Sequence, residues 1–197
     1  QVQVLTEGEI GDVILRNVAG ARGGDSIDVA MFYLSDRDAV RALIAAARRG
    51  VAVRVILDPN KDAFGRTKNG IPNRSVATEL GAASDGAIKV RWFRTHGEQF
   101  HSKLVAIRSA DEFWFTLGSA NLTRRNLDDF NLEANLAASV QPGSELAQQV
   151  SGWFEGLWTN QGPPELEYTA EFGAFADPAQ GTYWLYRLME ATGLSTF

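Results

Sequence analysis

Residues 26–58 read SIDVAMFYLSDRDAVRALIAAARRGVAVRVILD and contain two apolar segments on either side of an amphipathic one. Residues 26–34 and 51–58 are apolar and β-prone with little polar alternation, which predicts two strands buried on both faces. Between them, apolar residues recur at helical spacing from Val40 to Ala47, which predicts a helix. A strand, a helix and a second strand in this order indicate a parallel pair in an α/β fold.

The rest of the chain extends this pattern. Apolar residues at helical spacing predict a first helix over 10–18 and a last one over 146–157. Further elements are predicted as a short helix near 74–82 and strands at 87–93, 101–107, 112–118 and 130–140. We therefore predict an α/β fold with a mixed, largely parallel β-sheet flanked by helices on both faces. In this prediction residues 1–160 form one domain, and residues 161–197 form a tail packed on the domain or on a partner.

The composition limits the kinds of site that the chain can build. The chain has 197 residues, of which 45% are hydrophobic, as in an ordinary folded domain. It has no cysteine and two histidines, which excludes disulfides, thiolate nucleophiles and a histidine-rich metal site. We expect no cofactor and no bound metal, although carboxylates could still hold a hard cation. The net charge of −5 lacks the basic excess of a surface that binds nucleic acid without sequence preference.

The sequence leaves the location of the protein open. No apolar run approaches the roughly 20 residues that cross a bilayer, and the beginning lacks the features of a signal peptide. The first residue is Gln1, which indicates a processed chain or an excised domain. A short apolar patch near the end is interpreted as a packing or dimer element, not a membrane anchor. It comprises Tyr183, Trp184, Leu185, Tyr186 and Leu188.

A polar segment at residues 58–74, DPNKDAFGRTKNGIPNR, follows the second of the two strands and is predicted to be a long loop. Ligands of open α/β sheets bind at the edge where such loops leave the strands. Its basic residues are candidate contacts for an anionic substrate, with ordinary solvated surface charges as the alternative. They are Lys61, Arg66, Lys68 and Arg74.

Two short groups of polar residues in the second half of the chain carry the candidate chemistry. His101 and Lys103 are two residues apart on a predicted strand, so their side chains project from the same face. An imidazole beside an ammonium is suited to attack and hold a phosphate. One strand later, Gly118-Ser119-Ala120-Asn121 combines a glycine that permits close backbone approach with a hydroxyl and an amide. Each residue alone is more typical of a structural histidine or a turn; together they supply a nucleophile and several donors.

The spacing of these residues resembles the signature of the phospholipase D superfamily, H-x-K-(x)4-D followed by G-S-x-N. The resemblance covers roughly residues 5–160 and implies the phospholipase D/nuclease-like fold. It implies that His101 is the nucleophile and forms a phosphohistidine. In the same scheme Lys103 and Asn121 bind the non-bridging phosphate oxygens, and Ser119 assists.

Four further positions bear on this resemblance. Glu133 is similar to the family's acidic residue that hydrogen-bonds an active-site histidine and keeps its tautomer, with a surface glutamate on an edge strand as the alternative. The place of the motif aspartate is taken by Arg108, and the nearest acid is Asp111. His96, in the loop RTHGEQ, is interpreted as a solvated loop residue and not as a second catalytic histidine.

The resemblance implies two such motifs facing one another, because one histidine attacks while the other protonates the leaving oxygen. This sequence contains one motif. We therefore expect the second motif in an amino-terminal half of a duplicated protein, which the missing initiator methionine favours, or in a second copy of the chain within a homodimer.

The function implied is that of a bacterial, metal-independent phosphodiesterase that hydrolyses or transfers phospholipid headgroup diesters. The expected partners are a phospholipid or other phosphodiester substrate and a second phospholipase D-like half. A lipid substrate would place the site of this soluble domain at the cell envelope or a membrane surface. One alternative is a nuclease of the same superfamily, against which the overall acidity argues. The other is a catalytically inert phosphate-binding assembly module, for which Arg108 and the single motif are the grounds.

Overall fold

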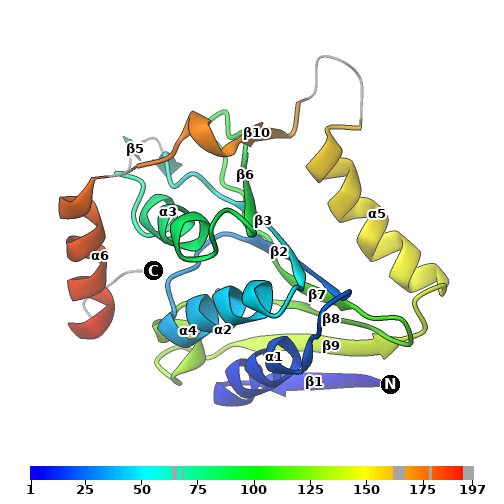
Figure 1. Cartoon of the computed structure of the whole chain (residues 1–197). Coiled ribbons are helices and arrows are strands. Elements are labelled where there is room, and N and C mark those ends of the chain that lie inside the picture. The colour runs from blue at the N-terminus through cyan, green and yellow to red at the C-terminus, as the bar shows by residue number, and fades with distance from the viewer. Residues whose placement is uncertain (64–65, 68, 162–166, 178, 193–197) are drawn as a thin grey trace.

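The computed structural model describes residues 1–63, 66–67, 69–161, 167–177 and 179–192. These form one eight-stranded sheet with helices on both faces, and a separate two-stranded hairpin (Figure 1). The strand order of the large sheet is β1-β9-β8-β7-β2-β3-β6-β10. The bounds are Val2–Thr6 for β1, Ser26–Met31 for β2, Ala52–Leu57 for β3, Lys89–Phe93 for β6, Lys103–Arg108 for β7, Phe113–Gly118 for β8, Ala134–Val140 for β9 and Thr169–Glu171 for β10. The hairpin joins β4, Asp62–Ala63, to β5, Arg66–Thr67.

The sheet is mixed, as predicted, but its parallel part is small. β2 pairs with β3 and β3 pairs with β6 in parallel. The other pairings, β1–β9, β9–β8, β8–β7, β7–β2 and β6–β10, are antiparallel. The α/β fold class is therefore confirmed, whereas the expectation of a largely parallel sheet is wrong. The turn between β7 and β8 is too short for the crossover that a parallel pair requires, so these strands return antiparallel.

The helices divide between the two faces of the sheet. Their bounds are Gly8–Gly20 for α1, Arg37–Arg48 for α2, Asn73–Ala83 for α3, Arg124–Leu127 for α4, Glu145–Thr159 for α5 and Gln180–Thr192 for α6. Figure 1 shows α1, α2 and α3 in front of the sheet, with α5 standing apart on the right. Successive residues of β2 serve the two faces: Val29 joins the core beneath the first three helices, and Ala30 joins a smaller core with Phe154 of α5.

Several elements lie outside the sequence predictions, and three of them, β1, β10 and α6, complete the two edges of the sheet and the end of the described chain. β1 is an edge strand whose Val2 and Val4 are exposed, so its short run carries little of the apolar signal of a buried strand. β10 is three residues long and pairs with β6, which makes it the opposite edge of the sheet. α6 extends through the apolar patch near the end of the chain. Both edges of the sheet are thus formed by segments too short or too exposed for their sequence to indicate a strand.

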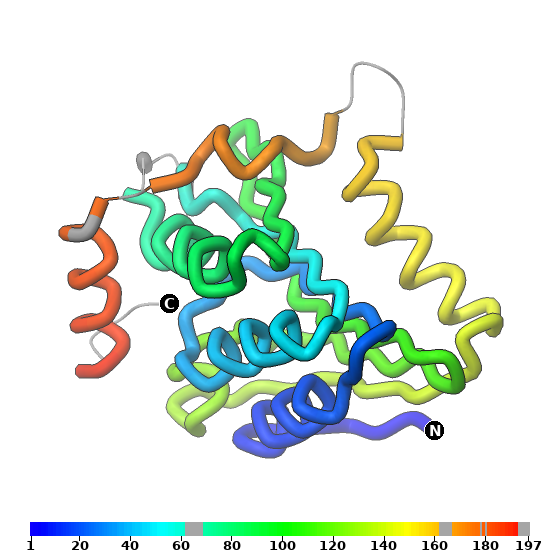
Figure 2. Tube along the Cα trace, in the orientation of Figure 1, coloured from blue at the N-terminus to red at the C-terminus, as the bar shows by residue number. Residues whose placement is uncertain are grey.

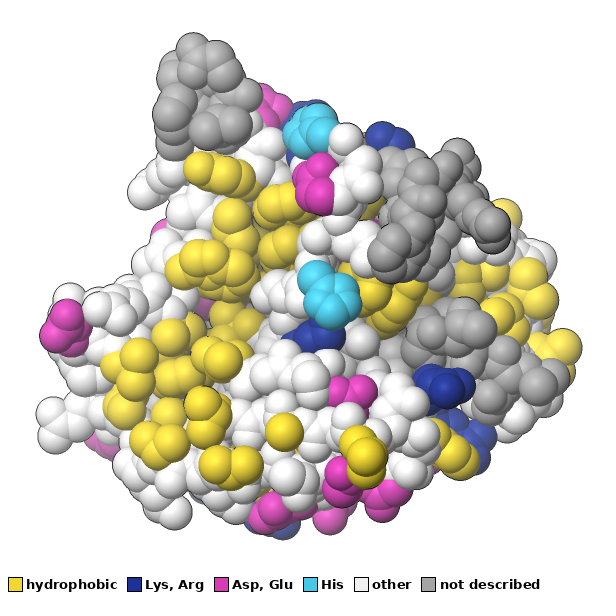
Figure 3. All heavy atoms as spheres, turned by 180° about the vertical axis from the view of Figure 1, so that it is seen from behind, with side chains coloured by type: hydrophobic (Ala, Val, Ile, Leu, Met, Phe, Trp, Pro, Cys, Tyr) yellow, Lys and Arg dark blue, Asp and Glu magenta, His cyan; other side chains and the backbone are white. Residues whose placement is uncertain are grey.

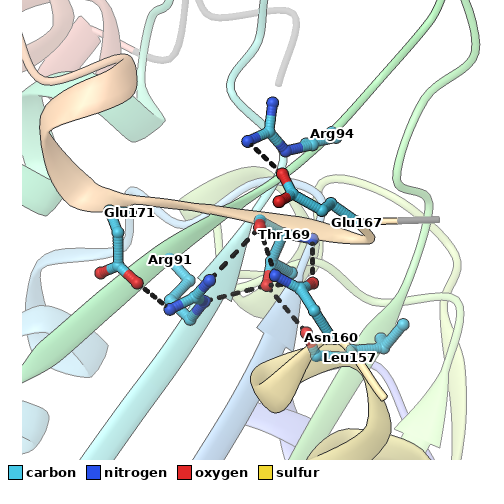
Figure 4. A network of polar contacts seen from close by, with 7 residues as sticks. All are labelled: Arg91, Arg94, Leu157, Asn160, Glu167, Thr169 and Glu171. Carbon is cyan, nitrogen blue, oxygen red and sulfur yellow. Dashed lines mark hydrogen bonds and ion pairs between the residues drawn. The ribbon is translucent and has the colours of Figure 1, made fainter. Parts of the chain in front are cut away.

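The end of α5 is tied to β10 by a network of hydrogen bonds (Figure 4). Asn160 ends the helix in a left-handed conformation, with φ 54° and ψ 41°. Its Nδ2 donates to Thr169 O at 3.0 Å, and its Oδ1 accepts from Thr169 N at 2.8 Å. The hydroxyl of Thr169 donates to Leu157 O at 2.8 Å and accepts from Arg91 Nε at 2.9 Å. α5 is therefore fixed to the sheet at its carboxyl end, on the strand pair β6–β10.

α5 and α6 lie at opposite ends of the molecule, and residues 167–177 lie between them (Figure 2). Tyr186 of α6 is fully buried and accepts a hydrogen bond from Arg37 Nη1 at 2.5 Å. Glu190 is also buried and accepts from Arg124 N at 3.0 Å, at the beginning of α4. The large hydrophobic side chains that are exposed on α6 are Trp184, Leu185 and Leu188. None of the helices in the described ranges is both long enough and apolar enough to cross a bilayer.

Candidate active site

The five site residues predicted from the sequence lie along the edge of the sheet where β2 and β8 end and β7 and β9 begin, or in the loops that leave this edge. Met31 at the end of β2 pairs with Lys103, so the beginning of β7 adjoins the end of β2. Leu104 pairs with Leu117, so the residues that follow β8 arrive at the same edge. The residues placed along this edge are His101, Lys103, Ser119, Asn121 and Glu133.

His101 lies in the loop immediately before β7, not on the strand as predicted. Lys103 is the first residue of β7, and its Nζ donates to the main-chain O of His101 at 3.0 Å. The ring of Phe32 contacts both groups. Its centroid lies 4.8 Å from the imidazole centroid and 5.2 Å from Lys103 Nζ. The imidazole and the ammonium therefore lie beside the same aromatic ring, that of Phe32. Their proximity does not come from alternation along one strand, because His101 precedes the strand.

The protonation states of the pair suit attack on an anion. Lys103 is 7% exposed, and burial lowers the pKa of its ammonium to about 8, an effect that the carboxylate of Glu133 partly offsets. The pKa of His101 is lowered from its usual 6.5, first by partial burial of the ring and second by the charge of Lys103. Near neutral pH the site therefore presents a neutral imidazole beside a charged ammonium, which are the forms needed to attack phosphorus and to bind its oxygens.

Glu133 connects the segment before β9 to the Gly-Ser-x-Asn segment. The hydroxyl of Ser119 donates to one of its oxygens, and Asn126 Nδ2 donates to the other. Its charge acts on Lys103, as the pKa of that residue records. In the described part of the chain, neither carboxylate oxygen is hydrogen-bonded to His101. A role for Glu133 in orienting a histidine therefore stays a prediction, while its contacts place it in the site and half-buried.

Asn121 is oriented by the end of β2. Its Oδ1 accepts a hydrogen bond from Tyr33 N at 3.2 Å, and its own main-chain N donates to Asn126 Oδ1 at 3.2 Å. Because the amide oxygen is engaged, the Nδ2 group is the end of the side chain that is left to donate to a ligand. This is the orientation required of a residue that binds a phosphate oxygen.

Gly118 has a structural reason to be glycine. A Cβ at this position would collide with the main-chain oxygen of Ala134 and with the side chain of Asn135 on β9. The close approach of β8 to β9 brings Ser119 next to its partners, since Ser119 N donates to Ala134 O and Ala134 N donates to Ser119 Oγ, each at 3.0 Å. The glycine of the motif therefore lets β8 approach β9 closely, and it also lines the pocket beside His101 and Lys103.

Arg108, which stands where the family motif has aspartate, points away from the site. Its guanidinium donates to Pro142 O at 3.0 Å and to Ser151 Oγ at 3.1 Å, and it lies 4.6 Å from the ring of Phe113. These contacts hold the beginning of α5 against the far end of β7. Arg108 therefore contributes to the docking of α5, and none of these contacts involves His101.

Two of the other candidates, His96 and Arg74, are engaged by groups outside the five site residues. His96 is exposed, and its Nδ1 lies 3.7 Å from a carboxylate oxygen of Glu98 on the same loop. Arg74 donates to Pro59 O at 2.8 Å, so it serves the fold. Lys61 is half-buried. Of the remaining candidates for anion binding, Lys68 and the side chain of Arg66 lie outside the described residues.

A hollow of about 450 Å³ opens beside His101 and Lys103, between the sheet and α5. Figure 3 shows the face on which a histidine and a basic side chain adjoin a field of hydrophobic side chains. The apolar walls of the hollow come from β7, β8 and α5, namely Leu104, Leu117, Leu146, Val150 and Trp153. The reactive pair therefore faces an apolar cavity on one side.

Three residues that contact the site were not predicted from the sequence. Phe32 is one apolar residue within an apolar run, yet its ring contacts both His101 and Lys103. Asn126 holds Glu133, and Asp58 holds the loop that carries His101. Phe32 and Asp58 act across large separations in sequence, whereas Asn126 lies seven residues before Glu133. A polar residue directly after a buried strand was the available signal for Asp58.

Solved structures with the same fold include Nuc from Salmonella typhimurium, described as a phospholipase D family member. It is 21% identical, with a TM-score of 0.61 over 83% of this chain and 97% of Nuc. NucT from Helicobacter pylori is 18% identical, with a TM-score of 0.61 over 81% of this chain and 96% of NucT. Phosphatidylserine synthase from Haemophilus influenzae Rd KW20 is 15% identical, with a TM-score of 0.65 over 98% of this chain and 46% of the synthase. No curated protein sequence matches the chain significantly.

The family assignment comes from a family model and not from these distant structures, which share the fold alone. The model described as "Cardiolipin synthase, PLD-like domain" matches residues 14–158. This range is most of the chain and includes every residue of the site described above. The chain therefore belongs to the cardiolipin synthase phospholipase D-like domain family, within the phospholipase D superfamily.

Proposed function

We propose that this chain is the catalytic half of a metal-independent phosphodiesterase that acts on phospholipid headgroup diesters through a phosphohistidine. The observation that carries the proposal is the pairing of a neutral, surface-exposed imidazole with a buried ammonium against the ring of Phe32. Reactive groups of these two kinds at one mouth of a hollow supply a nucleophile and an anion-binding charge.

The reaction consists of two displacements at phosphorus. In the first, an imidazole nitrogen of His101 attacks, an N–P bond forms, and the bond from phosphorus to the leaving oxygen breaks. A general acid from a second motif protonates that oxygen. Lys103 and the Nδ2 of Asn121 stabilise charge on the non-bridging oxygens. In the second displacement, water or an alcohol attacks phosphorus, the N–P bond breaks, and the proton of the acceptor passes to the group that served as acid.

The apolar hollow favours a lipid diester over a nucleic acid. Leu117, Val150 and Trp153 line the cavity beside His101, where a polynucleotide would require basic side chains. The net charge of −5 points the same way. Phosphatidylserine synthase shares the fold across nearly the whole of this chain, which supports a lipid substrate. A chromatin protein that binds DNA, TrmBL2, shares it with a TM-score of 0.50, so the fold by itself does not imply turnover.

The proposal is tested by assaying the chain, together with its second half, in excess chelator on three substrates. These are a phospholipid in mixed micelles, a chromogenic phosphodiester and single-stranded DNA. We expect turnover of the lipid to persist in chelator and to exceed that of DNA. Preference for DNA would instead establish the nuclease. No turnover of any substrate, with phosphate still bound, would establish the inert module.

A row of apolar side chains supplies a surface on which the second half can dock. Leu104, Leu117, Leu136 and Val4 are neighbours in register across β7, β8, β9 and β1, so they share one face of the sheet. Leu117, Leu136 and Val4 are between 42% and 64% exposed. The row continues from the hollow to the sheet edge. We propose that a second phospholipase D-like half, from the same protein or a second copy of this chain, covers this apolar row.

A charge placed in the apolar row is therefore expected to prevent pairing. If copies of this chain pair, Leu136→Asp should raise the dimer dissociation constant at least about tenfold, because a carboxylate would be buried without a partner. Turnover per chain should then fall at low concentration and recover at high concentration. Sedimentation velocity and activity over the same concentrations measure both effects. Ala45→Asp places the same charge at an exposed position of α2, on the opposite face of the sheet, and serves as the control. A monomer with full turnover would contradict the requirement for a second half.

A further inference from the structure

The main chain on both sides of His101 is held by buried hydrogen bonds. On one side, Phe100 N donates to Asp58 Oδ2 at 2.7 Å. On the other, Phe32 N donates to Ser102 O at 2.8 Å. The backbone on either side of His101 is therefore hydrogen-bonded to residues of the protein interior, while His101 itself is exposed.

The first of these bonds comes from an acid that the proposed chemistry does not use. Asp58 follows β3 and is 1% exposed. Its Oδ1 accepts from Asn60 N at 2.7 Å and from Asn60 Nδ2 at 3.3 Å, while its Oδ2 accepts from Phe100 N. Donors therefore converge on both carboxylate oxygens. An amide of the same size would turn an NH2 group toward one of these donors, so the position requires a carboxylate.

Asn73 ties the segment around Asp58 to its neighbours through four hydrogen bonds. Its Nδ2 donates to Asp58 O at 2.8 Å and to Phe32 O at 2.7 Å, and its main-chain N donates to Asn60 Oδ1 at 3.1 Å. Its Oδ1 accepts from Leu34 N at 2.9 Å. Asn73 and Asn60 are both buried. The network joins the ends of β2 and β3 to the beginning of α3, and Asp58 is the member that reaches the loop of His101.

The packing of the Phe100 side chain restricts the position of the neighbouring His101. Its ring is 6% exposed and stacks on Phe93, with 4.4 Å between centroids and 9° between planes. A residue whose amide and ring are both buried allows the next residue little freedom of direction. The position of the His101 imidazole over Phe32 therefore depends on the placement of Phe100.

We propose that Asp58 is a positioning residue, which aims the His101 imidazole at the bound phosphorus by holding the main-chain N–H of Phe100. The inference rests on the proposed function, because it takes His101 to be the attacking group. Among the described residues, the Asp58 carboxylate is hydrogen-bonded to Asn60 and Phe100 and not to the imidazole, so it is proposed to act through the loop. A displacement of the reacting atom by about 1 Å costs on the order of 100-fold in rate, so loss of this bond should affect the chemical step more than binding.

The test compares Asp58→Asn with the wild-type chain in its active, paired form. We expect kcat to fall about 10- to 100-fold and KM to change less than about threefold. In the free protein, NMR should show the Phe100 amide losing its protection from exchange and the His101 ring resonances broadening. The NMR measurement needs no substrate, so it reports on the positioning contact even if the proposed phosphodiesterase activity fails.

Two further proteins keep the test decisive. Asp28→Asn removes a carboxylate that is 13% exposed and pairs with Arg54 at 2.8 Å on the α5 side of the sheet. This variant should leave the Phe100 amide and kcat unchanged. Replacement of Phe100 by phenyllactic acid deletes only the N–H donor. It should reproduce the effect of Asp58→Asn, and it serves alone if that variant does not fold.

Each outcome bears on one idea. Retained protection of the Phe100 amide in Asp58→Asn would overturn the positioning role, and so would wild-type kcat in the phenyllactic acid protein. If Asp28→Asn lowers kcat as much as Asp58→Asn, the effect is one of general stability and the proposal is wrong. If the wild-type chain turns over no diester while the Phe100 amide responds as expected, the proposed function fails and the hold of Asp58 on the loop stands.

Discussion

Substitution of His101 by asparagine is expected to lower kcat by about four orders of magnitude or more, because it removes the nucleophile and with it the covalent route. The position is exposed and asparagine is polar and of similar size, so the fold should be unaffected. The measurement is steady-state turnover of the preferred diester, with thermal unfolding of the same samples followed by circular dichroism.

The same variant tests the intermediate. A diester with a good leaving group should give a burst of product with the wild-type chain and leave phosphorus on His101 as an acid-labile, base-stable adduct detectable by mass spectrometry. His96→Asn is the matched control, since His96 is exposed on a loop five residues earlier and away from the site. It should keep both the burst and the adduct. Turnover that survives in His101→Asn would rule out this histidine as the nucleophile.

Substitution of Lys103 by methionine is expected to lower kcat/KM by about 100- to 1000-fold while making the protein more stable. The loss of rate follows from removing a fixed cation next to the phosphate oxygens. The gain in stability, about 1–2 kcal/mol in the free energy of unfolding at pH 7, follows from removing a buried charge whose pKa has fallen to about 8. Chemical denaturation and steady-state kinetics on the same variant measure the two effects.

The pH dependence of the wild-type chain follows from the same two groups. His101 must be neutral and its pKa is lowered by burial and by Lys103, so kcat/KM should rise with pH through a pKa below the usual 6.5 and then level off. Lys103 must be protonated, so kcat/KM should fall as pH rises through about 8. Stability should change in the opposite direction. Between pH 8 and the unfolded value near 10.4, the folded state binds fewer protons than the unfolded state, so the free energy of unfolding increases with pH.

A second lysine provides the control for Lys103. Lys89 Nζ also donates to a main-chain oxygen nearby, that of Gly86 at 2.7 Å, but Lys89 is exposed. Lys89→Met should change neither stability nor kcat/KM appreciably. An alkaline limb that persists unchanged in Lys103→Met would show that another group titrates there, and a destabilised Lys103→Met would contradict the burial cost.

The strand-helix-strand unit and the grouping of the candidate site residues could be predicted because each is local in sequence, while the catalytic roles of these residues stay predictions. Residues 26–58 contain β2, α2 and β3 close to the predicted bounds, since the apolar pattern of buried strands and of a helix stripe is continuous there. The motif spacing identified His101, Lys103 and the Gly-Ser-x-Asn segment together. In each case the information lies within a few residues of the element concerned.

The remaining features depend on contacts between distant segments. Phe32 meets His101 across the β2–β7 pairing, and Asp58 meets Phe100 between two loops. Neither contact follows from local periodicity. The expectation of a largely parallel sheet was wrong for the same reason, because β7 inserts beside β2 and not next to its predecessor β6. His101 was predicted to lie on the same strand as Lys103, but it lies in the loop before β7. The two side chains are neighbours because both lie against the ring of Phe32.

The lack of space at Gly118 has a consequence for recognising active and inactive members of this fold. Any larger residue would force β8 and β9 apart, whether or not the protein catalyses anything. A descendant that had lost its nucleophile would therefore still be under selection to keep this glycine. In comparing such sequences, the glycine marks a sheet that closes properly, whether or not residues 101 and 103 keep the imidazole and the ammonium that are proposed to act on phosphorus.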